Sequence, residues 1–571
     1  MKKTNIKPIT RQFYKGNGLY FALAVCESVL AAGCSLLVSW LLQQLLDLID
    51  GNGVRFTLTE LVWITLAGIG VLVAAHLIAL FSKPKFVTKG ISQYKAYVFE
   101  GLTRKNISAF SGENMSTYIS GLTNDIAIIE KGYLRNTFTM LDSMLVFLGA
   151  VVLMLLYSPT LTLVAFLLSL FPLATSILAG DKVARQEKIV SDRNETYTAT
   201  LQDSLSGFSV IKSFKAEKQM IRIFRENVKA LADAQCTREQ VQILVSMFGS
   251  VAGVTAQIGV FIFGAYLALS GKGITAGTTM VFVQLMNYVL NPIATIPTCL
   301  AERKAAKALI EKVANALDSN VREEGQMEAK KLERGITVQN LSFGYEQDKP
   351  VLHHINCSFE VGKKYAIVGA SGCGKSTLLN LLMASHHHYD GSICYDDMEL
   401  RSITSASLYE MQSIIQQNVF VFNATIRDNI TMFHTFPEEQ IEKAMQLSGL
   451  TELVQKRGED YLCGENGSGL SGGEKQRISI ARSLLKKSQI LLVDEATAAL
   501  DAETAYQVSS AILGLEGITG IVVTHSLEEG LLKQYDKILT MKNGRIVESG
   551  TFEELIGEMG YFYSLFTISQ G

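Results

Sequence analysis

The sequence predicts a multidomain chain, with an all-α membrane-spanning domain of six helices followed by an α/β domain. Hydrophobic residues make up 48% of the 571 residues and charged residues only 19%, whereas soluble chains are about 25% charged. Apolar runs long enough to span a membrane occur only before residue 301. After about residue 335, short apolar runs alternate with amphipathic stretches, which is typical of α/β domains.

Six apolar runs reach the length of about 20 residues that a membrane span requires. They lie near Gly18–Leu46, Leu58–Phe81, Phe138–Leu156, Leu161–Gly180, Val241–Leu269 and Ile274–Leu300. The first run follows a basic N-terminus, as a signal peptide would. Because a signal core has only about 7–15 apolar residues, we interpret this longer run as an uncleaved span.

Basic residues predict the orientation of these spans. Lysine and arginine cluster in the N-terminus and in the long connections after the second and fourth spans. Positive charge stays on the cytoplasmic side, so both termini and the α/β domain are expected on that side. The membrane is expected to be the plasma membrane of a bacterium. Each long connection resembles two helical extensions around a break, near residues 107–116 and 208–218. These breaks are either docking elements for a soluble partner or plain connections.

Two acidic residues, Glu27 and Asp142, lie within predicted spans that contain no lysine or arginine. An ionisable group in a membrane usually faces a cavity or a partner. One interpretation is a cavity that prefers cationic or zwitterionic cargo. The other is interfacial placement or hydrogen bonding between helices.

The overall charge excludes one class of partner. The net charge is −2, which gives no electrostatic reason to bind nucleic acid. The eight cysteines are scattered without a C-x-x-C pair, so neither a zinc site nor a disulfide framework is indicated.

A phosphate-binding loop follows the apolar run Tyr365–Val368. Its pattern, G-x-x-x-x-G-K-[ST] before a helical stretch, is formed by Gly369, Ala370, Ser371, Gly372, Cys373, Gly374, Lys375, Ser376 and Thr377. The glycines let backbone N–H groups face phosphate oxygens at a helix N-terminus. Lys375 is expected to bridge the β- and γ-phosphates of ATP, and Ser376 to bind Mg²⁺.

A second motif, Ile490–Glu495, is an apolar strand that ends in two carboxylates. Asp494 is placed to hold Mg²⁺, directly or through water. Glu495 could act as the general base that polarises the attacking water.

A third motif, Leu470–Arg477, reads LSGGEKQR and opens an amphipathic helix. Ser471, Gly472 and Gly473 offer a second phosphate cradle of exposed N–H groups. One chain cannot easily surround one γ-phosphate with two cradles, whereas a symmetric pair of chains could. A simple helix cap is the alternative for this motif on its own.

These three motifs in this order resemble those of ATP-binding cassette (ABC) transporters of the exporter type, and the likeness runs from about residue 10 to the end. The resemblance implies a half-transporter with fused membrane and nucleotide-binding domains. It also implies further site residues: Tyr345 stacks on adenine, Gln417 meets Mg²⁺ and faces the membrane domain, and His525 contacts the γ-phosphate. Four further segments resemble the family's interface and coupling segments: Gly464–Gly467, Ala499–Asp501, Leu205–Gly207 and Ile211–Phe214.

The chain departs from the family pattern at two positions. Asp203 stands where the family often has glutamate, and Ala498 stands where serine commonly precedes Ala-Leu-Asp. The second change removes a hydroxyl from the interface loop. The run His386–His388 is interpreted as a polar stretch rather than a metal site, because adjacent imidazoles point in different directions.

The predicted domains are a membrane domain at 1–317, a linker at 318–334 and an ATP-binding cassette at 335–571. The predicted function is ATP-driven export or flipping of a hydrophobic, amphipathic or peptide substrate across a lipid bilayer by alternating access. The partner is a second copy of the chain or a related half-transporter, and the intact motifs favour the second copy. The alternatives are a siderophore-type importer on the same fold and an ATP-gated channel or regulatory subunit.

Overall fold

The structure is a computed structural model that describes residues 6–49, 56–111, 115–270, 274–318, 325–346, 349–497 and 500–570. Within these ranges, the side chains at 109, 111, 115–117, 173, 175–181, 183–184, 318 and 570 are outside the described set. The chain divides into two compact units, one of Met1–Thr103 and Met115–Ala316, the other of Arg104–Asn114 and Leu317–Gly571. Each unit has its own hydrophobic core.

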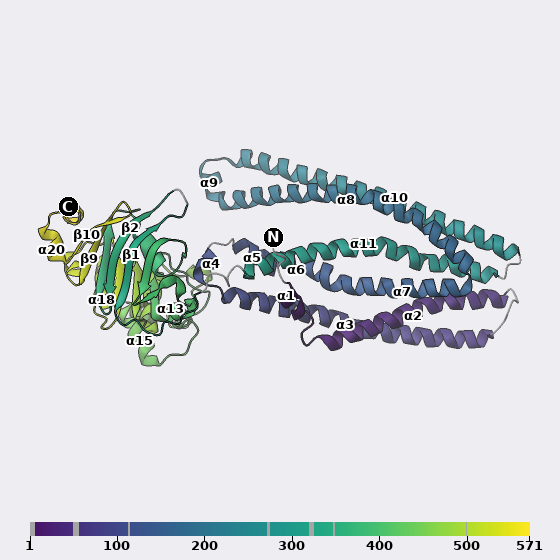
Figure 1. Cartoon of the computed structure of the whole chain (residues 1–571), viewed down its shortest axis with the longest axis horizontal. Coiled ribbons are helices and arrows are strands. Elements are labelled where there is room, and N and C mark those ends of the chain that lie inside the picture. Colours follow the sequence, from purple (N-terminus) through teal and green to yellow (C-terminus); the bar gives the residue numbers. More distant parts are fainter. Residues whose placement is uncertain are drawn as a thin grey trace. The chain divides into compact units, whose positions relative to one another are not determined.

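The first unit, the helical unit, contains long helices and short connecting turns (Figure 1). Its elements are α1 (Lys7–Gln12), α2 (Gly18–Ile49), α3 (Leu58–Thr103), α5 (Met115–Leu122), α6 (Asn124–Ile129), the π-helical turn η1 (Glu130–Arg135), α7 (Asn136–Tyr157), α8 (Pro159–Ser206), α9 (Phe208–Ser213), α10 (Glu217–Leu269) and α11 (Ala276–Asp318).

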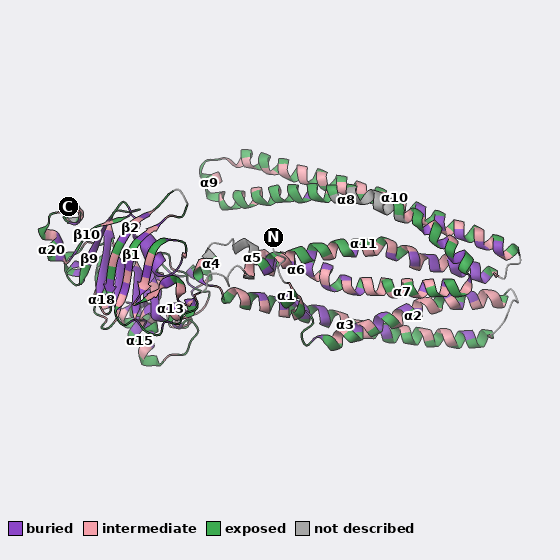
Figure 2. Ribbon diagram, viewed as in Figure 1, coloured by how far each residue is buried: buried purple, intermediate pink, exposed green. Residues whose placement is uncertain are grey.

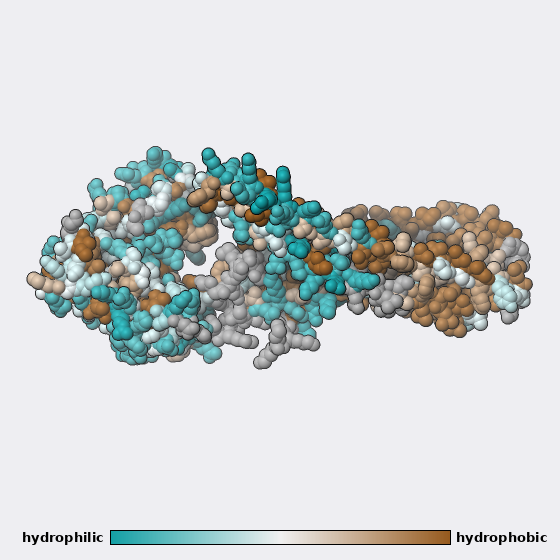
Figure 3. Space-filling model, turned by 90° about the horizontal axis from the view of Figure 1, so that it is seen from above, coloured by the Kyte–Doolittle hydropathy of each residue, from teal (hydrophilic) through white to brown (hydrophobic). Residues whose placement is uncertain are grey.

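Among the described residues, five helices are long and apolar enough to cross a membrane. They are Gly18–Ile49, Leu58–Thr103, Asn124–Tyr157, Glu217–Leu269 and Ala276–Leu317. Figure 3 shows apolar side chains gathered over the membrane-spanning end of these helices. The sixth predicted span lies in α8, where the apolar stretch of described residues is the shorter Pro159–Pro172. The count of six therefore stays a prediction.

The spans continue as helices beyond their apolar segments, as the sequence predicts. Helix α3 extends to Thr103, and α8 and α10 flank the short helix α9 at the second predicted break. Helices α8 and α10 pack side by side (Figure 1). The buried small residues Ala252, Ala256 and Gly264 follow one face of α10, which lets neighbouring helices approach closely.

The second unit, the cassette, contains the short helix α4 and all of the strands among the described residues. The strands are β1 (Gly335–Phe343), β2 (Leu352–Glu360), β3 (Lys364–Gly369), β4 (Asp390–Tyr395), β5 (Met398–Glu399), β6 (Gln412–Ile415), β7 (Ile490–Asp494), β8 (Thr519–Val523), β9 (Lys537–Lys542) and β10 (Arg545–Gly550). The helices are α4 (Ile107–Ser111), α12 (Lys375–Leu382), the 3-10 turn η2 (Leu400–Ser402), α13 (Ser405–Met411), α14 (Ile426–Thr431), α15 (Glu438–Leu447), α16 (Thr451–Arg457), the 3-10 turn η3 (Glu465–Gly467), α17 (Gly472–Lys486), α18 (Ala502–Leu513), α19 (Glu529–Leu532), α20 (Phe552–Gly557) and α21 (Tyr561–Gln570).

The cassette strands form two sheets. An antiparallel sheet has the order β2-β1-β4-β5, and a six-stranded sheet has the order β10-β9-β3-β8-β7-β6. In the larger sheet, β9, β3, β8, β7 and β6 are parallel, and β10 pairs antiparallel to β9. Strands β3, β7 and β8 are buried almost throughout (Figure 2). Their side chains join two hydrophobic clusters, one shared with α12 and the antiparallel sheet and the other shared with α18 and α19.

Two boundaries differ from the predicted domain limits. Part of the predicted linker packs on the cassette, because Ala329 and Leu332 are buried in its core and Met327 pairs with Ile403. The segment Arg104–Asn114, expected in the membrane domain, belongs to the cassette unit.

Candidate functional site

The phosphate-loop residues follow β3 and begin α12. The backbone of Gly374 has a φ of +102°, and a side chain there would meet Leu352 at 2.7 Å. Gly369 has a φ of +155°, and a Cβ would lie 2.3 Å from the carbonyl oxygen of Met541. Only glycine fits both positions, which explains their place in the motif.

Lys375 and Ser376 begin α12 and point toward the loop and the next strands. Lys375 is buried, and its Nζ donates to the carbonyl oxygens of Gly369 (3.0 Å) and Ala370 (3.1 Å). The Ser376 hydroxyl donates to Oδ1 of Asp494 at 2.9 Å. Burial raises the pKa of Asp494, the Ser376 hydrogen bond opposes this rise, and the neighbouring charge of Glu495 adds to it.

The carboxylate of Glu495 lies between two other predicted site residues. Gln417 Nε2 donates to its Oε2 at 2.7 Å, and His525 Nε2 lies 2.7 Å from its Oε1. Strands β6, β7 and β8 are neighbours, and these residues follow their carboxyl ends. The parallel sheet therefore brings together three side chains that are far apart in the sequence.

Tyr345 follows β1, and 58% of the residue is exposed. Its hydroxyl lies 3.3 Å from Thr377 Oγ1 in the phosphate loop. This contact connects the aromatic residue to the same loop as Lys375.

The Ser-Gly-Gly motif begins α17. The Ser471 side chain accepts from the N–H of Glu474 while the Glu474 side chain accepts from the N–H of Ser471, which is a capping box. The structure does not bring this motif to the other loop. Among the described contacts, Ser471 is paired with Glu474, and Lys375 with its own loop.

Some expected residues lie elsewhere. Ala498 and Ala499 lie outside the described residues, whereas Asp501 caps α18 through the N–H of Thr504. Asp203 lies in the last turn of α8, where its carbonyl accepts from the N–H of Gly207.

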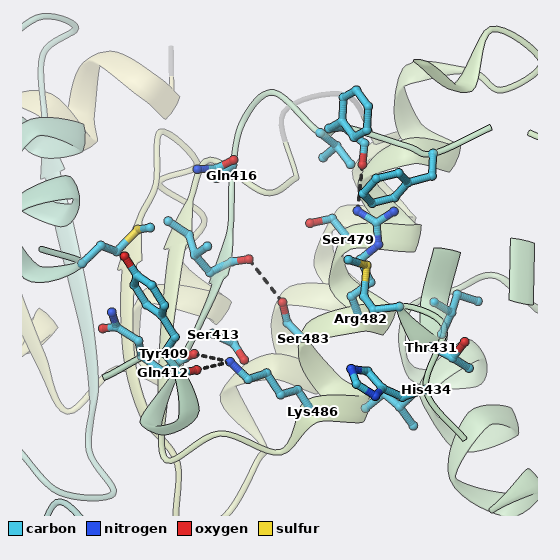
Figure 4. A pocket seen from close by; sticks show the side chains of 18 of the residues that line it. Tyr409, Gln412, Ser413, Gln416, Thr431, His434, Ser479, Arg482, Ser483 and Lys486 are labelled. Atoms are coloured by element: carbon cyan, nitrogen blue, oxygen red, sulfur yellow. Dashed lines mark hydrogen bonds between the residues drawn. The ribbon is translucent and has the colours of Figure 1, made fainter. Parts of the chain in front are cut away.

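A groove of about 570 Å³ on the cassette involves residues that sequence reasoning missed (Figure 4). The Tyr409 hydroxyl accepts from the N–H of Ile107, the first residue of α4. Lys486 donates to the carbonyl oxygens of Tyr409 and Gln412, and Arg482 donates to that of Phe420. No motif marks these residues, because the partners named here are backbone atoms from distant segments.

In the helical unit, Glu27 and Asp142 share one lysine. Lys83 Nζ lies 2.6 Å from Glu27 Oε2 and 3.3 Å from Asp142 Oδ2. Lys83 falls just past the predicted second span, but α3 continues without a break and carries it between the two acids. We call Glu27, Lys83 and Asp142 the ionic triad. The triad agrees with the interpretation that these acids bond neighbouring helices together. The positive charge of Lys83 also offsets one of the two acidic charges that the other interpretation assigned to a cationic cargo.

Two family models match the chain. The model described as ABC transporter transmembrane region matches residues 21–293, and the model described as ABC transporter matches residues 352–498. Across nearly all of both chains (98% of each), the fold is similar to that of a structure titled "Structure of a bacterial Atm1-family ABC exporter with ATP bound". The TM-score is 0.82 at 21% identity, so this likeness concerns the fold alone.

Curated relatives extend over most of the sequence. The ATP-dependent lipid A-core flippase of Desulfotalea psychrophila is 30% identical over 492 residues, 84% of each chain. The uncharacterized ABC transporter ATP-binding protein YwjA of Bacillus subtilis is 30% identical over 481 residues, 82% of each chain. The lipid A-core flippase of Sodalis glossinidius is 28% identical over 569 residues, 96% of this chain and 95% of that one. The relatives, the fold and the hydrogen bond between the phosphate loop and Asp494 all indicate the same family. The chain belongs to the ABC transporter family and is an ATP-hydrolysing transporter whose membrane region and ATP-binding domain are fused.

Proposed function

We propose that the chain is an ATP-driven exporter or flippase for a hydrophobic, amphipathic or peptide substrate, working as a pair of identical chains. One observation carries the proposal. The phosphate loop, Asp494, Glu495, Gln417 and His525 converge at one edge of a sheet, in a chain that also has membrane-spanning helices.

The residues present fit MgATP. Ser376 and Asp494 offer hard oxygen atoms, which Mg²⁺ prefers, and Gln417 keeps an amide oxygen while its nitrogen donates to Glu495. When bound, Mg²⁺ would neutralise phosphate charge. Lys375 and the loop N–H groups would hold the phosphates, and Tyr345 would stack on adenine.

Glu495 is the proposed general base. Its two carboxylate oxygens each have one partner, Gln417 or His525, so the side chain is held at a fixed angle. A positioned carboxylate can accept a proton from the water that attacks the γ-phosphate. His525 would then orient Glu495 and contact the γ-phosphate.

A second copy is supported by two incomplete surfaces. To enclose one nucleotide, the phosphate loop with Lys375 in one chain would need the Ser471–Gly473 cradle of a second chain. In addition, α9 has no buried residue. Its apolar side chains Phe208 and Val210 are 58% and 57% exposed, and Phe214, which follows the helix directly, is 78% exposed. Apolar exposure of this kind on a cytoplasmic tip suits a protein contact. We propose that α9 docks in the cassette groove of the second copy.

The docking proposal is tested with Phe208→Ser/Phe214→Ser in lipid nanodiscs. We expect less dimer by mass photometry in the presence of ATP and lower ATPase activity. Val547→Ser, which changes an exposed apolar residue on β10, is the control. Unchanged dimerisation would reject docking through α9.

Export is favoured over import because two of the relatives described above are named as lipid A-core flippases. The test uses vesicles with the cassettes outward, in a bacterial plasma-membrane lipid mixture. The probes are a fluorescent phospholipid, a cationic dye and a labelled peptide, with Glu495→Gln as the inactive control. ATP-driven accumulation of a probe, or its transfer to the inner leaflet, supports export. Loss of preloaded probe indicates an importer, and hydrolysis with no movement of any probe indicates the channel or regulatory alternative.

The proposed orientation keeps both termini and the cassette in the bacterial cytoplasm, with the basic stretches of α3 and α8 on the same side. Labelling of single cysteines in intact cells tests this orientation. Cysteine at Thr57, between the first two spans, should react with an impermeant reagent, whereas cysteine at Lys218 should not.

A further inference from the structure

The histidine run after α12 has no role in the site described so far. It begins four residues after the end of the phosphate-loop helix, and its first member, His386, is half-buried. The chain reverses at Ala384, which has a φ of +56°, and Ser385 donates its N–H to the carbonyl oxygen of Asn380. This tight turn brings the His386 ring back toward the end of β1.

His386 belongs to a cluster of three rings with Phe343 and Tyr345. The His386 and Tyr345 ring centroids are 5.4 Å apart, with the planes at 86°. Phe343 lies 5.1 Å from each of the other two rings, at 80° to Tyr345 and 31° to His386. These are the edge-to-face and offset arrangements that aromatic pairs prefer.

The cluster restricts Tyr345 while leaving much of its surface open. Two neighbouring rings and the contact between its hydroxyl and Thr377 restrain both torsions of the side chain. At the same time, Tyr345 remains 58% exposed. When a flat ligand stacks on a ring that is already held in place, the ring loses less conformational entropy on binding.

We infer that His386 is a positioning residue for the nucleobase: its ring holds Tyr345 in the orientation that stacks on adenine. This inference rests on the proposed role of Tyr345 in ATP binding. His386 itself needs no contact with the nucleotide, and its contribution is to the affinity for the base rather than to hydrolysis.

The chemistry of the ring agrees with a packing role. Burial lowers the pKa of His386, and His387 acts in the same direction, so the imidazole is mostly neutral near pH 7. A neutral ring packs on two aromatic rings without the desolvation of a charge. Among the described residues, no three histidine, cysteine or acidic side chains are grouped to hold a metal ion.

The test compares His386→Ala with His386→Phe in the full-length protein in lipid nanodiscs. Loss of one aromatic contact should raise the KM for ATP about 3- to 10-fold in His386→Ala. The kcat should stay within about twofold, because Glu495 and its partners are untouched. His386→Phe keeps a ring of similar shape and should restore the KM.

Inorganic triphosphate separates base positioning from general damage, since it has phosphates but no base. Its inhibition constant against ATP should be equal in the wild type and His386→Ala. His354→Ala is the control, because this exposed histidine contacts Asn340 and not the ring cluster. Thermal unfolding of each variant checks that the cassette is folded.

Three results would overturn the inference: an unchanged KM in His386→Ala, no restoration by phenylalanine, or an equal loss of triphosphate affinity. Tyr345→Ala distinguishes these from failure of the proposed function. If Tyr345→Ala raises the KM and His386→Ala does not, only the positioning role is lost. If Tyr345→Ala itself leaves the KM unchanged, the adenine assignment fails and the inference with it.

Discussion

The proposed hydrolytic site of the cassette and the ionic triad of the helical unit are both built from charged and polar groups, but in different ways. In the cassette, Asp494 and Glu495 are adjacent in sequence, and their partners follow neighbouring parallel strands. In the helical unit, the triad joins three helices, and its members are more than fifty residues apart.

This difference explains why the cassette site can be predicted from sequence motifs and the ionic triad cannot. The edge of a parallel sheet is a fixed meeting place, so a residue just after a strand can be assigned to the site from its motif. Contacts between helices depend on their rotation and on where they continue past the apolar core. We therefore expect substitutions in the cassette site to change catalysis and substitutions in the ionic triad to change stability.

The largest expected effect is on hydrolysis. Glu495→Gln removes the proposed base and should lower ATPase activity by about 100-fold or more, since general-base catalysis contributes about that much. ATP binding, measured with a fluorescent analogue, should remain. Glu503→Gln, on the exposed start of α18, serves as the control. Activity near that of the wild type would reject Glu495 as the base.

The next effect concerns the triad. Lys83→Met leaves two carboxylates without their shared cation, and should lower the free energy of unfolding by about 3 kcal/mol, the low end for a buried ion pair. Glu27 is the most buried member, with 7% of its side chain exposed, while Lys83 and Asp142 are more accessible. Thermal unfolding in nanodiscs measures the change.

Lys85→Met, two residues along α3, is the control for the triad because Lys85 is exposed. The variant Glu27→Gln/Lys83→Met/Asp142→Asn should recover much of the stability, since it removes all three charges. Equal unfolding temperatures for the two single lysine variants would show that the triad is not a stabilising link.

A smaller effect separates two equivalent helix caps. Ser471 on α17 and Thr551 on α20 both form capping boxes. Replacing either by alanine should cost about 1 kcal/mol of stability. Only Ser471→Ala should also lower ATPase activity, by about tenfold, the loss expected for one hydrogen bond to a charged group. Equal ATPase losses in both variants would mean that Ser471 acts only as a cap.

The smallest effect depends on pH. Burial opposes ionisation of Asp396, but the N–H groups of Glu333, Gly335 and Arg334 outweigh it and hold the pKa below its usual value. Its contribution to stability is therefore present above pH about 4, the usual pKa of aspartate, and is lost as the pH falls further. Asp396→Asn should destabilise the protein slightly at pH 7, and this difference should shrink below pH 4. A constant difference across the titration would contradict the assignment.

Much of the fold could be predicted because its signals are local. The apolar runs predicted the long helices, and the alternation after residue 335 predicted the α/β cassette. The phosphate loop and the strand before Asp494 are also continuous in sequence, so their elements were found. The roles of the site residues remain predictions.

The rest depended on contacts between distant segments. Lys83 reaches both acids only because α3 stays helical through Pro84. Met327, Ala329 and Leu332 are isolated apolar residues within a charged stretch, too few to reveal that this segment packs on the cassette. Similarly, the bond from Ile107 to Tyr409 joins residues 302 positions apart.

The backbone at Glu495 has a φ of +51°, in the left-handed region that a glutamate rarely adopts. This conformation is unfavourable by about 1–3 kcal/mol. Yet it turns the chain sharply after β7, and the hydrogen bond from its N–H to Val523 holds it there. Glycine at 495 would relieve the torsion and make the cassette more robust to heat, at the expense of turnover. We propose that the role of Glu495 in hydrolysis, rather than stability, accounts for an acidic residue at this bend.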